Sequence, residues 1–285
     1  MERVVFREAI QGLEVEQVVR DFEYSMTTRH FHETYELYFL KEGERYYFID
    51  KETYLVKSGD VVLIKRDQIH KTSMAGSSYH NRILLQMRSE VCDPVLRANG
   101  LLSIEEFYER SDQIISLTES DSKTVENLLL TMKDEIQKRQ KYGEQMVYLK
   151  LIELFIILSR YKKSTSFMKE NQKARTAKYQ KVHEVADYLL SCPETKEGLE
   201  ELAKRFYISK SYLTRIFREV TGFTVNEYMN VARTKKAQNL LVHSGYSITE
   251  IAEILGFESI TYFERVFKKY TDDTPMKYRK RMKNS

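Results

Sequence analysis

Cysteine is scarce in this 285-residue chain, which contains only Cys92 and Cys192. Two thiols at unrelated positions provide neither a disulfide framework nor the clustered ligands of a zinc knuckle. Because proteins without structural disulfides are typical of reducing compartments, we expect the chain to be cytoplasmic.

Long apolar runs are also missing. The most apolar stretch, residues 146–158, is interrupted by Lys150 and Glu153 and is shorter than the roughly 20 residues that a membrane span requires. Residues 1–10 carry four charges, and their apolar runs are too short for a signal peptide. The sequence therefore predicts no export and no membrane contact, and it favours a buried helix at residues 146–158.

Charge is unevenly distributed along the chain, whose 46 basic and 42 acidic side chains give a net charge of +4. Residues 160–285 hold 25 basic and 15 acidic side chains, a net charge of +10, and residues 1–159 hold 21 basic and 27 acidic ones, a net charge of −6. The length favours more than one domain. A basic C-terminal part is suited to a polyanionic partner such as double-stranded DNA.

Two segments of the last third repeat one another. The first reads LEELAKRFYISKSYLTRIF from Leu199, and the second reads ITEIAEILGFESITYFERVF from Ile248. The offset between matching residues grows from 49 to 50 across the middle, so the turn of the second copy is one residue longer. Helices of unchanged phase on either side of a short turn predict a duplicated helix-turn-helix.

The second helix of each copy has an apolar stripe and a polar outer face. Ser209 and Ser259 are predicted N-caps, and Gly256 is suited to the left-handed turn between the helices. An exposed helix of this kind fits the major groove, where guanidinium and hydroxyl groups can bind base edges. The predicted DNA-binding residues are Lys210, Ser211, Thr214, Arg215 and Arg218 in the first copy, and Ile260, Thr261, Tyr262, Arg265 and Lys268 in the second.

Residues 225–243, between the copies, are predicted to form one long helix. Nineteen residues span about 28 Å, close to the roughly 34 Å between successive major grooves on one face of DNA. One chain can therefore read two adjacent grooves. Arg233, Lys235 and Lys236 on this helix are candidate phosphate contacts, although a solvated helix face is the alternative for each.

These motifs resemble the DNA-binding domain of AraC/XylS-type transcription regulators over residues 182–279. The resemblance rests on SYLTRIFREVTGFTVNEYM in the first copy and on IAEILGF, SITYFERVFKKY and TPMKYR in the second. It implies seven helices, with base-reading positions at Ser211, Thr214, Arg215, Ile260, Thr261, Tyr262 and Arg265. It also implies a homodimer, with RNA polymerase as a candidate partner. Asp272 departs from the pattern, because the family usually has glycine there.

The first 90 residues have a different pattern of residue types. Short runs rich in aromatic and β-branched residues (ELYFL, RYYFI, TYLV, DVVLI and RILLQM) are separated by KEGE, DKE, KSGD and MAGSS. Such short strands with tight turns predict a β-sandwich or barrel. The spacing of HFHETYELYFLKEG and KSGDVVLIKRDQIH resembles the two motifs of the cupin barrel, although Lys65 and Asp67 stand where metal-binding cupins usually have proline and glycine.

The cupin-like motifs supply a candidate ligand site in the barrel interior. We expect it to bind a small polar effector, with a sugar as the first candidate, through His30, His32, Glu36, Tyr38, Tyr47 and His70. No cofactor is expected. The alternative is a divalent metal held by His30, His32, Glu36 and His70. Satisfied core histidines and ordinary strand packing of the two tyrosines are the other interpretations.

In residues 121–161 the apolar side chains recur at the spacing of an α-helix. Val125, Leu128, Leu129, Met132 and Ile136 mark the first amphipathic helix. The second, residues 144–160, is apolar nearly all round and is predicted to be covered on more than one side. The pair either packs on the barrel or forms a dimer interface, as the resemblance implies. Residues 162–178 are polar and basic, which is typical of a linker.

The sequence thus predicts an α+β multidomain protein with an N-terminal cupin-like β-barrel, a helical segment and a C-terminal all-α domain with two helix-turn-helix units. The expected boundaries are 1–120 for the barrel, 121–161 for the dimerisation helices, 162–178 for the linker and 179–285 for the DNA-binding domain. The expected function is a ligand-controlled transcription regulator without enzymatic activity. The alternatives are a metal-dependent cupin enzyme fused to a DNA-binding domain, and a regulator that binds no ligand and is controlled by partner proteins.

Overall fold

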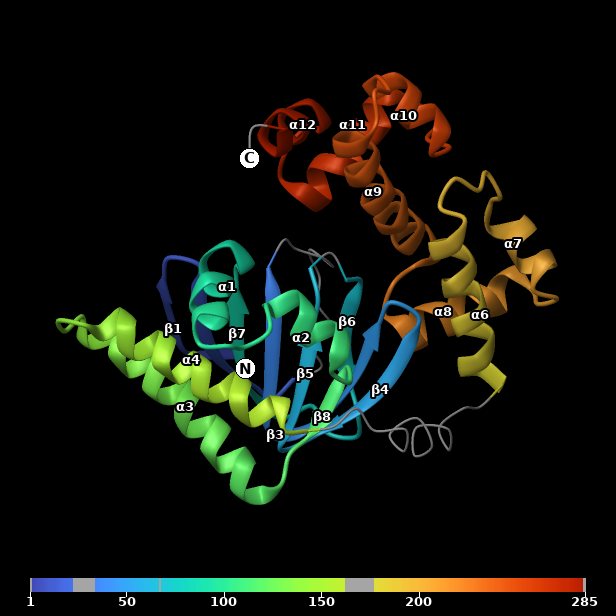
Figure 1. Ribbon diagram of the computed structural model, residues 1–285. Coiled ribbons are helices and arrows are strands. Elements are labelled where there is room, and N and C mark those ends of the chain that lie inside the picture. The colour runs from blue at the N-terminus through green and yellow to red at the C-terminus, as the bar shows by residue number, and fades with distance from the viewer. Residues whose placement is uncertain (1, 23–33, 67, 162–176, 284–285) are drawn as a thin grey trace.

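The computed structural model describes residues 2–22, 34–66, 68–161 and 177–283 (Figure 1). The N-terminal domain (residues 2–161) contains strands β1 (Glu2–Ile10), β2 (Leu13–Arg20), β3 (Tyr35–Ile49), β4 (Glu52–Lys57), β5 (Asp60–Ile64), β6 (His70–Met74), β7 (His80–Met87) and β8 (Ile114–Ser116), and helices α1 (Ser89–Ala98), α2 (Ile104–Arg110), α3 (Glu119–Lys138) and α4 (Gly143–Ser159). The C-terminal domain (residues 177–283) contains α6 (Ala177–Ser191), α7 (Leu199–Arg205), α8 (Lys210–Thr221), α9 (Val225–His243), α10 (Ile248–Ile254), α11 (Ile260–Thr271) and α12 (Pro275–Lys283). The predicted fold class is confirmed.

The strands of the N-terminal domain pair antiparallel in the order β1-β2-β7-β3-β5-β8, and β4 and β6 pair with the second half of β3. The prediction of a turn at residues 41–44 was wrong, because β3 continues through this segment. Gly43 has a φ of 97°, and the register against β7 shifts between Leu40 and Glu42. A bulge with glycine bends the strand without ending it, so β3 passes from one set of partners to the other.

The two faces of the N-terminal sheet have different neighbours. Because side chains alternate along a strand, Tyr35, Leu37 and Phe39 point to one side and Tyr38 and Leu40 to the other. The first set is buried against helices α1 to α4, which cover this face in Figure 1. The second set lines the interior of the domain together with residues of β4 and β5. The interior face therefore remains available for a ligand pocket.

Helices α3 and α4 lie antiparallel across the sheet (Figure 1). All five apolar residues predicted for the inner stripe of α3 are buried. The expectation for α4 was only half right, because one side of this helix is covered and the other is not. Met146, Leu149 and Ile156 are exposed at helical spacing, and the Leu149 side chain is 55% exposed. This stripe is apolar although the described part of the chain leaves it exposed, which explains why the sequence pattern predicted a helix covered on more than one side.

The C-terminal domain confirms the predicted repeat. Helices α7 and α8 form one helix-turn-helix and α10 and α11 form the other, and α9 spans the predicted residues 225–243. Ser209 and Ser259 cap α8 and α11 by accepting hydrogen bonds from Tyr212 N and Tyr262 N. Seven helices lie between residues 177 and 283, as the family resemblance implies.

The turns that end α8 and α11 explain the unusual Asp272. Gly222 closes α8 in the left-handed region at a φ of 75°, and Asp272 closes α11 in the same region at 64°. Aspartate is among the few non-glycine residues that enter this region, since its short polar side chain can hydrogen-bond locally. The departure from the family pattern therefore leaves the turn intact.

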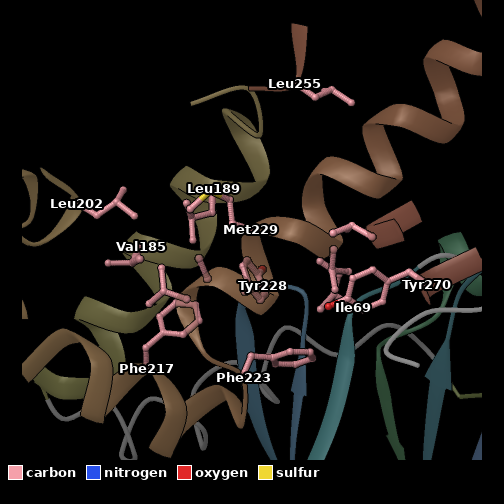
Figure 2. Packing of buried hydrophobic residues seen from close by; sticks show 14 of the residues in the cluster. Ile69, Val185, Leu189, Leu202, Phe217, Phe223, Tyr228, Met229, Leu255 and Tyr270 are labelled. Atoms are coloured by element: carbon pink, nitrogen blue, oxygen red, sulfur yellow. The ribbon is translucent and has the colours of Figure 1, made fainter. Parts of the chain in front are cut away.

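Tyr228 lies at the centre of the apolar cluster of the C-terminal domain (Figure 2). Its ring centroid is 5.4 Å from that of Phe217 in α8 and 5.9 Å from that of Phe223, and the residue is fully buried. Edge-to-face rings at these distances are favourable beyond their buried area. The cluster holds α8 against α9, so it fixes the orientation of the first helix-turn-helix.

The two domains are in contact through the second half of β3, the turn after it, and β6. Phe48 and Ile69 of the N-terminal domain are buried in the same cluster as Tyr228, and Figure 2 shows Ile69 together with Phe223 and Tyr228. Polar contacts surround this apolar centre. Lys71 Nζ donates to the Gly222 carbonyl, and the Tyr228 hydroxyl donates to the Asp50 carbonyl. In addition, Lys51 Nζ lies 2.6 Å from Asp187, Lys235 Nζ lies 3.7 Å from Asp50, and the His183 ring lies 3.7 Å from Glu52 and 3.5 Å from Thr53 Oγ1. We call this set the domain contact.

Most of the predicted linker, residues 162–176, lies outside the described residues, and Ala177 and Lys178 belong to α6. Across the described ranges, no helix is both long enough and apolar enough to cross a membrane.

Candidate nucleic-acid interface and ligand pocket

Helix α8 presents the first candidate DNA-binding face. Leu213, Ile216 and Phe217 are buried against the rest of the domain, so the opposite side of the helix faces outward. That side carries the predicted residues Lys210, Ser211, Thr214, Arg215 and Arg218, all of which are exposed. Exposed cations and hydroxyls along one helix face are the groups that contact phosphates and base edges.

Helix α11 presents the matching face of the second repeat. Phe263, Val266 and Phe267 are buried, and Ile260, Thr261, Arg265 and Lys268 are exposed on the opposite side. Tyr262 is only partly exposed, and its hydroxyl accepts a hydrogen bond of 3.0 Å from Asn230 of α9. Of the ten predicted residues, Tyr262 is therefore the one that also supports the packing of α11 on α9.

Each face holds its arginine over a tyrosine ring. The Arg215 guanidinium lies 5.3 Å from the ring centroid of Tyr212, and that of Arg265 lies 5.2 Å from the ring centroid of Tyr262. Arg215 also lies 3.5 Å from Glu219, one turn further along α8. Cation–π contacts at an exposed site are weak, about 0.5–1 kcal/mol, so they orient the guanidinium and still release it to a ligand.

Arg233 does not fit its predicted role as a phosphate contact. Its side chain is buried, with Nε donating to the Pro193 carbonyl at 3.1 Å and Nη2 donating to the Thr195 carbonyl at 2.7 Å. Its guanidinium also lies 5.3 Å from the ring centroid of Phe257. Arg233 thus ties the loop before α7 to α9. Sequence alone could not separate this role from surface exposure, because the loop that accepts its hydrogen bonds is distant in sequence.

A small pocket lies inside the N-terminal domain, between β2, β3, β6 and β7. Its lining consists of Arg20, Glu36, Tyr38, Tyr47, Thr72, His80, Arg82 and Leu84, and its volume is about 70 Å³. The sequence predicted Glu36, Tyr38 and Tyr47 for this site. The two tyrosine rings meet edge to face at 5.1 Å, and both residues are almost completely buried.

His70 lies next to this pocket. Its Nε2 is 3.7 Å from a carboxylate oxygen of Glu36, and its ring stacks at 6.4 Å on Tyr47. His30 and His32, the other two histidines predicted for the site, lie outside the described residues. Within the described parts of the chain, the structure has no group of three or more His, Cys, Asp or Glu side chains placed to hold a metal ion.

Four polar residues of the pocket, together with Leu84, were missed by the sequence analysis: Arg20, Thr72, His80 and Arg82. A usable signal existed for two of them. Along β7 the residues His80, Arg82 and Leu84 alternate with Asn81 and Ile83, so a strand assigned from its two-residue period places the histidine and arginine on one face. Arg20 and Thr72 lie on strands that the sequence analysis did not identify.

Burial shifts the pKa values of Tyr38, Tyr47 and His80 in the direction that favours their uncharged forms. It raises the pKa of the Tyr38 and Tyr47 hydroxyls above the usual value of 10, so both are protonated donors at neutral pH. Burial, together with the positive charge of Arg45, lowers the pKa of His80 to about 4. His80 is therefore an uncharged imidazole at neutral pH, with its Nδ1 3.1 Å from the Ser78 carbonyl.

Both domains match families of known proteins. Residues 17–129 match the family described as the AraC-like ligand binding domain, and residues 202–281 match the family described as a helix-turn-helix domain. The Msm operon regulatory protein of Streptococcus mutans is 26% identical over 271 residues, covering 95% of this chain and 91% of that protein. The transcriptional activator RhaR of Salmonella dublin is 26% identical over 255 residues, covering 88% and 86% respectively.

A crystal structure of ToxT from Vibrio cholerae O395 is similar with a TM-score of 0.39 and 14% identity, covering 97% of this chain and 100% of that one. The matches to both domains, and the relatives that extend over nearly the whole length, show that the chain belongs to the AraC family of transcription regulators, with a ligand-binding domain followed by a helix-turn-helix DNA-binding domain.

Proposed function

We propose that this regulator reads its operator with the exposed faces of α8 and α11, placed in two successive major grooves by α9. The observation that carries the proposal is the matched pair of exposed, tyrosine-supported arginines, Arg215 and Arg265, at equivalent positions of the two repeats. Affinity then comes largely from neutralised phosphates, and specificity comes from the base contacts of the two helices.

The use of both helices can be tested by letting the full-length protein select duplexes from a random pool. Two inserted helices are expected to enrich two short sequence blocks about 10–10.5 base pairs apart for each protomer, since that is the repeat of the major groove on one face. Enrichment of a single block, or none, would contradict the use of both helices.

The N-terminal pocket is proposed to bind a small polar effector. Glu36, Tyr38, Tyr47 and Thr72 line this pocket together and offer both acceptor and donor groups. A polar ligand is favoured over an apolar one because these buried groups gain hydrogen bonds from it. We propose that the protein is a cytoplasmic regulator and not an enzyme, with RNA polymerase as its partner at the promoter. The alternative of a metal in the barrel rests on His30, His32, Glu36 and His70 together.

A homodimer is proposed to form through the exposed stripe of α4. Met146, Leu149 and Ile156 repeat at the spacing of one helix face, and the same face of a second copy would cover them. Replacing Leu149 with glutamate places a charge in the middle of this face. We expect the variant to sediment as a monomer at concentrations where the wild type is dimeric, with an unchanged circular dichroism spectrum.

Ile254 offers the matched control for Leu149. It is an apolar residue of α10 that is 42% exposed and lies outside α4, so Ile254→Glu adds the same charge and should leave the association constant unchanged. If Leu149→Glu associates as tightly as the wild type, α4 is not the dimer interface.

We propose that the domain contact holds back the C-terminal domain and that effector binding loosens it. Strand β6 links the two sites, because Thr72 lines the pocket while its neighbour Lys71 donates to the carbonyl of Gly222 at the end of α8. When docked, the acidic N-terminal domain is held close to the helices that must approach DNA. Like-charge repulsion between that domain and the phosphates is then greatest.

Lys71→Ala tests the direction of this control. Loss of its hydrogen bond weakens docking by about 1 kcal/mol, which corresponds to up to roughly fivefold tighter binding to the selected duplex. Removing a positive charge by itself would weaken DNA binding, so an increase is diagnostic. Lys65→Ala removes a lysine paired with Glu109, away from the contact, and should have no effect. Unchanged or weaker binding by Lys71→Ala would contradict the proposal.

A further inference from the structure

The pocket in the N-terminal domain is strongly basic on one side. Arg20 and Arg82 line it from the adjacent strands β2 and β7, where Arg20 pairs in register with His80. Arg45 of β3 is completely buried and, with Arg20 and Arg82, acts on the protonation of His80. Three guanidiniums that influence one buried imidazole create a positive potential within a region of low dielectric constant.

The acidic side chains around this region do not use all of its donors. Arg20 lies 3.2 Å from Glu2, and Arg82 Nη2 lies 2.6 Å from Glu16. Glu16 is shared with Arg7 and does not line the pocket. Arg82 Nη1 is buried and has no hydrogen-bond partner among the described residues. A buried charged donor without an acceptor is costly, and a carboxylate is the acceptor that suits a guanidinium best.

The other side of the pocket is suited to hydroxyl groups. Glu36 is held by a 2.9 Å hydrogen bond from Gln86 and keeps acceptor capacity, since each carboxylate can accept about four hydrogen bonds. Thr72 and the protonated hydroxyls of Tyr38 and Tyr47 can each donate or accept. A volume of about 70 Å³ is far below the roughly 300–1,000 Å³ of typical ligand pockets, so the occupant must be compact.

From this arrangement we infer that the effector is a small hydroxy acid, whose carboxylate binds Arg82 and Arg20 and whose hydroxyl groups bind Glu36, Thr72 and the two tyrosines. The inference rests on the proposed effector function of the same pocket. It makes that function more specific, because a neutral sugar or polyol would leave the guanidinium side without an anion.

Matched small molecules test the inference on the full-length wild-type protein. Glycerate and tartrate carry both groups, glycerol and erythritol carry only hydroxyls, and propionate carries only the carboxylate. In calorimetric titrations at constant ionic strength, we expect the hydroxy acids to bind at least tenfold more tightly than either the polyols or propionate. They should also raise the melting temperature.

Arg82→Gln identifies the site that binds the acid. We expect it to weaken binding of glycerate or tartrate at least tenfold while leaving the weak binding of glycerol unchanged. Arg97→Gln removes an arginine on α1 that is 61% exposed and should match the wild type. The ligand comparison on the wild type remains decisive if Arg82→Gln does not fold.

Three results would overturn the inference. If polyols bind as tightly as the acids, the effector is still a polar molecule, but the inference that it is a hydroxy acid is wrong. Equal losses from Arg82→Gln and Arg97→Gln would place the acid elsewhere. Absence of binding by every probe would reject small hydroxy acids as effectors, whereas the duplex selection decides independently whether the protein reads DNA as proposed.

Discussion

Replacing Arg215 or Arg265 with alanine is expected to weaken binding to the preferred duplex by about 1–3 kcal/mol each, or roughly 5- to 150-fold in Kd. Both guanidiniums lie on exposed helix faces and are oriented by a tyrosine ring. A guanidinium that binds a guanine edge through two hydrogen bonds has no replacement when it is truncated. Nonspecific binding should change little, because phosphate contacts from the remaining cations persist.

Fluorescence anisotropy at fixed salt concentration, with the selected duplex and a scrambled duplex of equal length, separates the two effects. Arg97→Ala provides the matched control, since it removes an exposed arginine from the N-terminal domain. An equal loss of affinity for both duplexes would assign Arg215 and Arg265 to phosphate contacts and would remove them from base recognition.

Tyr228→Ala is expected to lower the free energy of unfolding of the C-terminal domain by about 3–5 kcal/mol, the cost of removing a large aromatic side chain from a core. The ring contacts Phe217 and Phe223 and is completely buried. Because the cavity would open beside α8, the variant should also lose most of its DNA binding near 37 °C. Urea denaturation followed by circular dichroism measures the change in stability.

Tyr228→Phe separates the ring from the hydroxyl. The hydroxyl donates to the Asp50 carbonyl across the domain contact, whereas the ring supports the core. The phenylalanine variant should therefore keep nearly all of the stability that the alanine variant loses. If both variants lose the same amount, the hydrogen bond to Asp50 rather than the packing of the ring holds this cluster together.

The C-terminal domain could be predicted almost completely from the sequence because its determinants are local. The apolar stripes of α8 and α11 have a helical period, and the caps at Ser209 and Ser259 lie immediately before the helices that they start. The long helix α9 begins with a capping box formed by Thr224 and Glu227. Each of these signals lies within a few residues of the structure it specifies, so no knowledge of tertiary contacts was needed.

The N-terminal domain was harder to predict because its determinants are distant in sequence. Whether residues 41–44 turn or continue depends on β7, which pairs with β3 about 40 residues later. Arg20 and Arg82 come together only through the pairing of β2 with β7. The exposed stripe of α4 is likewise invisible to a pattern that reports only apolar residues, since the pattern does not show which side the sheet covers.

The domain contact was also not predictable, because the sequence pattern around Phe48 and Ile69 is that of an ordinary strand and turn and does not indicate an interface. They are buried only because the C-terminal domain lies against them, more than 100 residues further along the chain. Because they are buried in this cluster, the two domains are in direct contact, although the sequence analysis predicted only a linker between them.

Helices α8 and α11 are proposed to enter two successive major grooves. Methylation interference at guanine N7, which lies in the major groove, measures this directly on the selected duplex. We predict two clusters of interference about 10–10.5 base pairs apart for each protomer, one erased by Arg215→Ala and the other by Arg265→Ala. A pattern that neither substitution alters would contradict the insertion of these helices.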